Sequence, residues 1–86
     1  MEDLISMDML KRRIKYLYEK HPNIHINIKI TSPKLHLENV PARIVGVYPN
    51  IFIISENSKG YEERHTLMYT DVWIGQIEIL ELTKFK

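Results

Sequence analysis

Residues 44–54 carry the most restrictive pattern in this chain of 86 residues. Two apolar runs, residues 44–48 and 51–54, are rich in β-branched and aromatic residues, so both faces of each predicted strand are apolar. The Pro49-Asn50 pair between them is typical of a tight turn, because proline fixes φ and asparagine tolerates tight backbone angles. We therefore expect a hairpin with one face closed against other strands and the second covered by a helix or a partner chain.

The length and the absent residue types narrow the class of protein. At 86 residues the chain is near the lower size at which a single core is sufficient, so we expect one domain over residues 1–86. Cysteine is absent, which excludes a disulfide framework and a thiolate metal site. The acidic start is unlike a signal peptide, and no apolar run approaches the roughly 18 residues that span a bilayer. We therefore expect a cytoplasmic protein without a membrane partner.

The first half of the chain predicts a helix followed by a strand. Apolar residues recur at steps of three and four over residues 3–20, which is one stripe of an amphipathic helix. Pro22 ends this helix, because proline disfavours helical geometry in the residue before it. Isoleucines alternate with polar residues over residues 24–30, which predicts a strand with one buried face. Residues 31–41 lose the pattern and are predicted to form a loop with room for a short strand.

After the central hairpin the pattern predicts two more strands. Residues 61–69 are extended, and Thr70-Asp71-Val72 interrupt them as a single tight turn in which the Asp71 carboxylate caps nearby backbone amides. A last strand is predicted over residues 73–82. Its alternation slips near Gly75, where we expect a bulge.

The order of these elements predicts a small barrel. One helix followed by about five short strands in meander order is typical of an SH3-like or Sm-like fold. The expected class is therefore mainly β with one helix: an N-terminal helix within residues 1–21 and a five-stranded barrel over residues 24–86. A ferredoxin-like fold is disfavoured because it needs a second helix for which the chain has no room.

Basic residues gather in the half of the chain before the central hairpin. Residues 1–43 hold eight Lys/Arg and five Asp/Glu, whereas residues 44–86 hold four and six. The candidate contacts to nucleic acid or to an acidic partner are Lys11, Arg12, Arg13, Lys15, Lys29 and Lys34. The plainer interpretation, a solvated helix face, is favoured because the net charge is only +1.

Aromatic residues on the predicted strands are candidates for stacking on bases. They are Tyr48, Phe52, Tyr61 and Tyr69. Core positions are the favoured interpretation for these rings, above all for Phe52.

Three segments of the second half carry the residues of a family motif. In order they are Val47-Tyr48-Pro49-Asn50-Ile51-Phe52-Ile53, Tyr69-Thr70-Asp71-Val72 and Ile77-Glu78-Ile79. This order resembles the Veg family of small proteins from low-GC Gram-positive bacteria, which has a Tyr-Pro-Ser segment, a Tyr-Ser/Ala-Asp segment and a closing Val-Glu-Leu strand at similar spacing. The matching positions are Tyr48, Pro49, Phe52, Tyr69, Asp71 and Val72, all with structural roles.

The resemblance implies a small barrel and a non-enzymatic regulatory protein, since the family is labelled a stimulator of biofilm formation. The chain departs from the family between the first two strands, where members carry a glycine-rich basic run and this chain keeps only Lys34 of that charge. Trp73 also stands where the family has leucine. The chain therefore resembles a divergent member, whose contact with an acidic partner is lost or has moved to the helix.

The sequence offers no constellation for catalysis, a cofactor or a metal. His21 and His25 have the i,i+4 spacing of a helical metal pair, but Pro22 ends the helix between them and no third ligand follows at a recognisable spacing. His65 near Glu63 is interpreted as a surface pair. Nucleophile motifs, phosphate-cradling glycine loops and dinucleotide fingerprints are absent. We therefore expect no enzyme, no cofactor and no metal.

Two functions of different class fit these features. The first is a non-enzymatic interaction protein that binds a protein partner through its barrel. It would form a homodimer, because one helix does not cover the whole second face of the hairpin. The second is a nucleic-acid-binding module that uses the basic helix.

Overall fold

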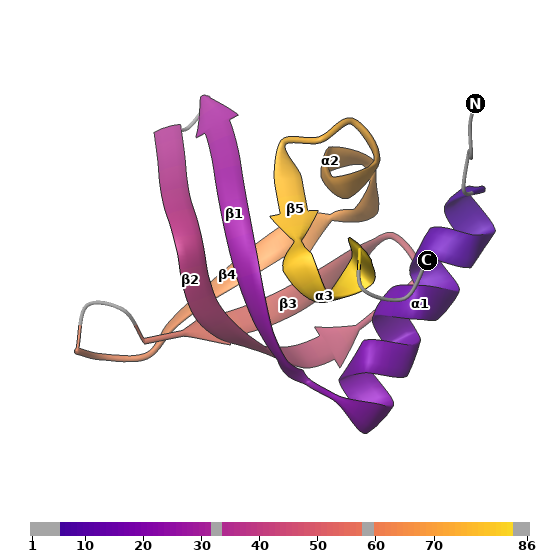
Figure 1. Ribbon diagram of the computed structural model, residues 1–86, viewed down its shortest axis with the longest axis horizontal. Helices are drawn as coiled ribbons and strands as arrows, with labels where there is room; N and C mark the ends of the chain where they lie inside the picture. Colours follow the sequence, from indigo (N-terminus) through magenta and orange to yellow (C-terminus); the bar gives the residue numbers. More distant parts are fainter. Residues whose placement is uncertain (1–5, 32–33, 58–59, 84–86) are drawn as a thin grey trace.

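The computed structural model describes residues 6–31, 34–57 and 60–83, which form an antiparallel sheet with a helix at one end (Figure 1). The elements are α1 Met7–Lys20, β1 Asn23–Thr31, β2 Lys34–Val47, β3 Ile51–Glu56, β4 Glu63–Met68, α2 Tyr69–Trp73, β5 Ile77–Ile79 and α3 Leu80–Thr83. The predicted class, mainly β with an N-terminal helix, is confirmed. Within the described part of the chain, no helix has the length and apolarity needed to cross a membrane.

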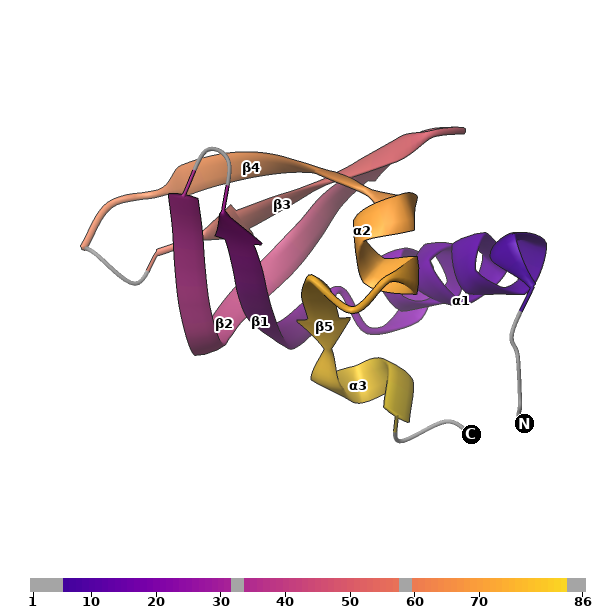
Figure 2. The ribbon, with the colours of Figure 1, turned by 90° about the horizontal axis from the view of Figure 1, so that it is seen from above.

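The five strands follow the order β4-β3-β2-β1-β5, and every pair is antiparallel. Strands β4 and β5 are the two edges, and the described residues show no pairing between them. The closed barrel predicted from the sequence is therefore not present. Strand β5 has only three residues, and α2 lies between β4 and β5 in the chain (Figure 2).

Helix α1 confirms the predicted amphipathic stripe. The Ser6 hydroxyl accepts a hydrogen bond from the Met9 N–H at 3.1 Å, which caps the helix start. Leu10, Ile14 and Leu17 are buried and pack on the core. Residues 3–5 of the predicted helix lie outside the described residues.

The core lies on the inner face of the sheet. In β1 the alternate isoleucines Ile24, Ile26 and Ile28 are buried, which confirms the predicted strand. The central hairpin is also confirmed, because the Tyr48 N–H donates to the Ile51 carbonyl oxygen at 2.9 Å and closes the Pro49-Asn50 turn. The residues on its outer face are half-buried within this single chain.

The predicted loop over residues 31–41 is wrong from Lys34 onward, because β2 runs from there to Val47 without a break. A proline has no N–H to donate to a neighbouring strand. Pro41 is tolerated in β2 because it pairs only with His25 of β1, and the pairing of β2 with β3 begins one residue later, at Ala42. A register shift near Asn39 interrupts the alternation that would have revealed the strand.

The predicted final strand over residues 73–82 is present only in its middle, and its bounds are wrong. Trp73 ends α2, only Ile77–Ile79 is strand, and α3 follows. Gly75 lies in the turn after α2 with φ of +91°, so its role is a left-handed turn and not a bulge. Asp71 lies inside α2, whose N-cap is Met68 without a side-chain bond, so the predicted cap is wrong as well.

Candidate functional site

A groove of about 340 Å³ lies between α1 and the turn that joins β2 to β3. We call it the basic-aromatic groove. It is lined by Lys11, Arg12, Lys15, Tyr18, Val47, Tyr48, Pro49 and Tyr69. The lining combines three cationic side chains with three aromatic rings, from segments far apart in the sequence.

The helix wall of the groove is set by helical periodicity. Lys11, Lys15 and Tyr18 follow steps of four and three, so they form one stripe of α1. This stripe is displaced by one position from the buried stripe Leu10, Ile14 and Leu17. Lys11 is therefore half-buried beside the core, whereas Lys15 and Tyr18 are exposed.

The opposite wall is formed by Tyr48, at the end of β2. Its side chain is 51% exposed and passes over Gly46, where an added Cβ would lie 2.9 Å from the Tyr48 Cε2 atom. The absence of a side chain at Gly46 therefore allows the Tyr48 ring to come close to this position of β2.

Tyr69, the first residue of α2, forms the floor of the groove and is only 2% exposed. Its hydroxyl donates to the Tyr48 carbonyl oxygen at 2.7 Å, and the Lys11 ammonium nitrogen lies 5.5 Å from its ring centroid. Burial raises the pKa of the Tyr69 phenol, so the hydroxyl stays a neutral donor at neutral pH. A ligand with negative charge therefore meets no phenolate at the floor.

The groove continues past Lys11 and Tyr69. A smaller cleft of about 170 Å³ shares these two residues and is bordered by Asn50, Met68 and Thr70 among others. The two hollows together make an elongated path along α1, which suits an extended ligand better than a compact one.

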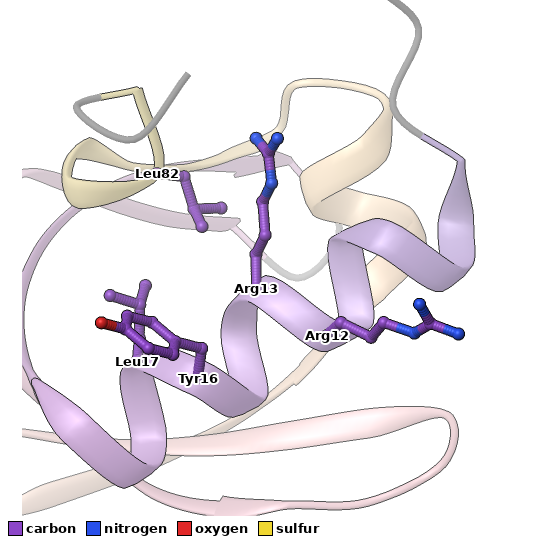
Figure 3. A pocket seen from close by; sticks show the side chains of 5 residues that line it. All are labelled: Arg12, Arg13, Tyr16, Leu17 and Leu82. Carbon is purple, nitrogen blue, oxygen red and sulfur yellow. The ribbon is translucent and has the colours of Figure 1, made fainter.

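Three of the six predicted contact residues line the groove: Lys11, Arg12 and Lys15. Arg13 lies instead in a second cleft of about 320 Å³ beside Leu82, and Figure 3 shows its side chain extending away from that of Arg12. Lys29 is exposed on β1 and does not line the groove. Lys34 begins β2, and its side chain lies outside the described residues.

The family-motif positions divide between groove and core. Tyr48, Pro49 and Tyr69 line the groove. Phe52 is fully buried, as predicted, and Val72 packs against the core. The core interpretation is wrong for Tyr48 and also for Tyr61, which is 57% exposed. Both residues lie outside the strands, Tyr48 directly after β2 and Tyr61 two residues before β4, where the strand alternation does not apply.

Sequence reasoning missed Tyr18 and Val47 as groove residues. The signal for Tyr18 was present, because it follows Lys11 by seven residues and Lys15 by three and therefore shares their helix stripe. Nothing in the sequence marked Val47 as a groove residue, because a valine in an apolar strand ordinarily lies in the core.

The groove offers cationic and aromatic binding groups. Among the described residues that line it there is no carboxylate and no imidazole. Lysine and arginine attract phosphate or carboxylate groups, and the exposed rings of Tyr18 and Tyr48 present flat faces for stacking. The arrangement therefore suits a flat anionic ligand.

Comparison with known proteins assigns no family to this chain. No protein-family model matches it, and no curated protein matches it. The resemblance to the Veg family stays a prediction.

Proposed function

We propose that the protein is a non-enzymatic binding module of the Veg type that holds single-stranded nucleic acid in the basic-aromatic groove. The observation that carries the proposal is the placement of Lys11, Arg12 and Lys15 in one groove with the exposed rings of Tyr18 and Tyr48. Backbone phosphates would contact the cations, and bases would stack on the rings at about 1 to 3 kcal/mol each. The elongated path along α1 supports an extended strand as the ligand.

A small SH3-like or Sm-like barrel, opened between β4 and β5, is part of this proposal. The strand order β4-β3-β2-β1-β5 supports it, as does the short helix α2 between the two edge strands. The OB-fold, another small partly open barrel, binds oligonucleotides on a strand face and adjoining loops.

The second candidate is the interaction protein expected first from the sequence, with an acidic segment of a protein partner in the same groove. Val47 and Pro49 favour it, because they give the groove an apolar border that a peptide side chain would cover. The modest net charge of +1 also suits a peptide better than a long polyanion.

The first test is fluorescence anisotropy of labelled single-stranded RNA and of duplex DNA. Three phosphate contacts on a single strand predict an affinity loss of about 20-fold between about 50 and about 200 mM salt. The duplex is expected to bind more weakly, because its stacked bases cannot reach the tyrosine rings.

Variants on the same helix locate the site. Lys11→Ala with Lys15→Ala should abolish binding and flatten the salt dependence, and Tyr48→Ala should weaken binding while leaving the salt slope intact. Arg13→Ala is the matched control, because it removes a cation from the same helix outside the groove. Equal losses from Arg13→Ala would contradict the assignment of the groove. No binding at the lower salt would retire the nucleic-acid function and leave the acidic peptide.

A further inference from the structure

The smaller cleft beside the basic-aromatic groove has a lining of a different kind. Its volume is about 170 Å³, and it is lined by Met7, Lys11, Asn50, Met68, Tyr69 and Thr70. Lys11 and Tyr69 also line the groove, so the two hollows meet at these residues. A strand that follows the groove past Lys11 therefore reaches the cleft next.

Two methionines give the cleft an apolar lining. Met7 belongs to α1 and packs against the core, whereas Met68 ends β4 and is 49% exposed. Thioether side chains are polarizable and make favourable contacts with aromatic rings. The cleft that they line thus suits a flat aromatic group such as a nucleobase.

Asn50 supplies the cleft with a donor and an acceptor side by side, the NH₂ and carbonyl groups of its amide. It is exposed in the turn between β2 and β3. The Tyr48 N–H donates to the Ile51 carbonyl oxygen at 2.9 Å across this turn, and the Tyr69 hydroxyl donates to the Tyr48 carbonyl oxygen at 2.7 Å. These two bonds hold the backbone that presents Asn50 at the cleft.

The chemistry of the Asn50 amide favours adenine among the bases. One amide makes two hydrogen bonds to a base edge that carries a donor next to an acceptor, which in adenine are N6–H₂ and N7. In an unpaired strand the N1 atom on the other side of N6 offers the same combination, so adenine matches the amide through either edge. On its N7 edge guanine presents two acceptors, which use only the NH₂ group of the amide.

We propose that the smaller cleft is a subsite for one adenine base of the single strand, read by Asn50 and placed next to a phosphate held by Lys11. This inference rests on the proposed nucleic-acid function and adds a base preference to it. Met7 and Met68 would contact the adenine ring. The rings of Tyr18 and Tyr48 would stack on a neighbouring base in the groove without selecting it.

The test is fluorescence anisotropy of labelled uridine heptamers that differ only in the central base, which is U, A, C or G. The strand with adenine should bind about tenfold more tightly than the all-uridine strand, because a bidentate amide contact discriminates between bases. Asn50→Ala should remove this preference and leave the affinity for the all-uridine strand and its salt dependence unchanged. Among the described residues other than glycine only Asn39 has a positive φ, so alanine fits the backbone of Asn50.

The opposite end of β3 supplies the matched control. Asn57 is exposed there, directly after Glu56, and lines none of the three hollows described above. Asn57→Ala removes the same amide group as Asn50→Ala and should leave the preference for adenine unchanged.

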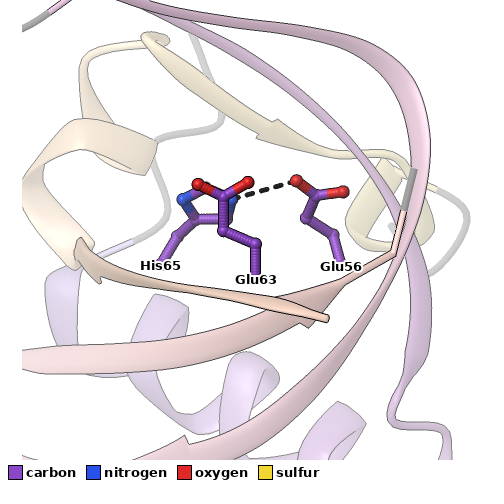
Figure 4. A group of neighbouring side chains, drawn as sticks. All are labelled: Glu56, Glu63 and His65. Atoms are coloured by element: carbon purple, nitrogen blue, oxygen red, sulfur yellow. Dashed lines mark hydrogen bonds and ion pairs between the residues drawn. The ribbon is translucent and has the colours of Figure 1, made fainter. Parts of the chain in front are cut away.

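The side chains beside Asn57 contact one another inside the sheet. Figure 4 shows Glu56, Glu63 and His65 converging, and the Glu56 Oε2 atom lies 3.2 Å from the His65 Nε2 atom. The His65 side chain is only 11% exposed and its hydrogen bond runs to Glu56, so the surface pair predicted with Glu63 is wrong. The control position therefore lies beside a packed end of the β3–β4 pair.

The outcomes separate the subsite from the proposed function. Equal affinity for the adenine and uridine strands would overturn the subsite and leave the nucleic-acid function standing, and so would a preference for guanine or cytosine. Loss of the preference in Asn57→Ala as well as in Asn50→Ala would overturn the role of Asn50. Absence of binding to every heptamer would refute the nucleic-acid function and the subsite with it.

A measurement on the unmodified protein locates the base without any substitution. In proton NMR, added AMP should shift the methyl signals of Met7 and Met68, because the ring current of a bound base acts on nearby methyl groups, and UMP should shift them less. Met9 is the control, since it lies on the same helix and lines neither hollow. A shift of the Met9 signal as large as those of Met7 and Met68 would overturn the placement of the base in the cleft.

Discussion

Tyr69 contacts both the core and the groove. Its ring centroid lies 5.3 Å from the Phe52 ring centroid in the core. The Lys11 ammonium nitrogen lies 5.5 Å from the same Tyr69 centroid, in the groove. Its hydroxyl also holds the backbone of Tyr48. One side chain thus links core packing to the wall of the candidate site. Substitutions beneath the groove are therefore expected to change ligand binding as well as stability.

Phe52→Ala should lower the free energy of unfolding by about 3 to 5 kcal/mol, because it opens a cavity where the side chain is fully buried and removes the ring contact with Tyr69. Urea unfolding followed by circular dichroism measures this loss. Phe52→Leu is the control for ring shape and should cost less. A urea midpoint unchanged by the alanine substitution would show that the core assignment is wrong.

Gly46→Ala should weaken binding of single-stranded RNA with little change in stability. The added Cβ would lie 2.9 Å from the end of the flexible Tyr48 side chain, so the ring moves and the strand stays. Anisotropy measures the affinity, and the urea midpoint checks the fold. If the effect passes through Tyr48, Gly46→Ala should cost nothing further in a Tyr48→Ala background. Additive losses would contradict this explanation.

At the scale of elements, the Glu81 side chain links α3 to β1. The Glu81 carboxylate accepts a hydrogen bond from the His25 backbone N–H at 2.8 Å, and its second oxygen lies 2.9 Å from His25 Nδ1. Burial alone would raise the pKa of Glu81, but the bonds from the His25 ring and backbone outweigh it and leave the pKa below its ordinary value of 4.5. The ionised carboxylate therefore stabilises the attachment.

Glu81→Gln should lower the free energy of unfolding by about 1 kcal/mol at neutral pH, since it removes the negative charge that strengthens the hydrogen bonds from His25. Because the folded pKa is depressed, the stabilisation is present above the unfolded value of 4.5 and is lost as the pH falls through the folded pKa. Urea unfolding of both proteins across this range should show their stabilities converging in acid.

Glu78→Gln on the adjacent strand β5 is the matched control for that experiment. The Glu78 carboxylate accepts from the Asn27 side-chain amide at 3.0 Å, and a glutamine oxygen accepts the same bond. If the difference in free energy of unfolding between the unmodified protein and Glu81→Gln stays constant with pH, the charge of Glu81 does not stabilise the attachment.

At the scale of the whole molecule, the outer face of the central hairpin has only partial cover. Val45, Ile51 and Ile53 are half-buried, while α1 contacts β2 and α2 at one end of the sheet (Figure 2). The homodimer predicted from the sequence would complete the cover of these side chains. The homodimer remains a prediction that rests on the apolar residues of this outer face.

Light scattering at high protein concentration should give twice the mass of one chain. Ile53→Lys should dissociate the dimer, because it places a charge in the half-buried outer face. Glu19→Lys on the exposed side of α1 is the control for added charge and should leave the mass unchanged. A monomeric mass for the unmodified protein would refute the dimer.

The sequence by itself determined the elements whose pattern is local. Helix α1, strand β1 and the hairpin around Pro49 follow from side-chain spacing within a few residues, and so does the basic stripe along the helix. The class of fold was therefore predictable, and so were the three cationic residues of the groove, Lys11, Arg12 and Lys15.

The tertiary structure decided what depends on partners distant in the chain. Strand β2 extends back to Lys34 because β1 pairs with it on both sides of a register shift. Strand β5 ends at Ile79, where α3 begins. The groove needs α1 beside the Tyr48 turn, and the Glu56–His65 contact needs the register of β3 on β4. Such registers depend on the turn that joins two strands and on which face of the sheet is buried, so the spacing within one strand does not determine them.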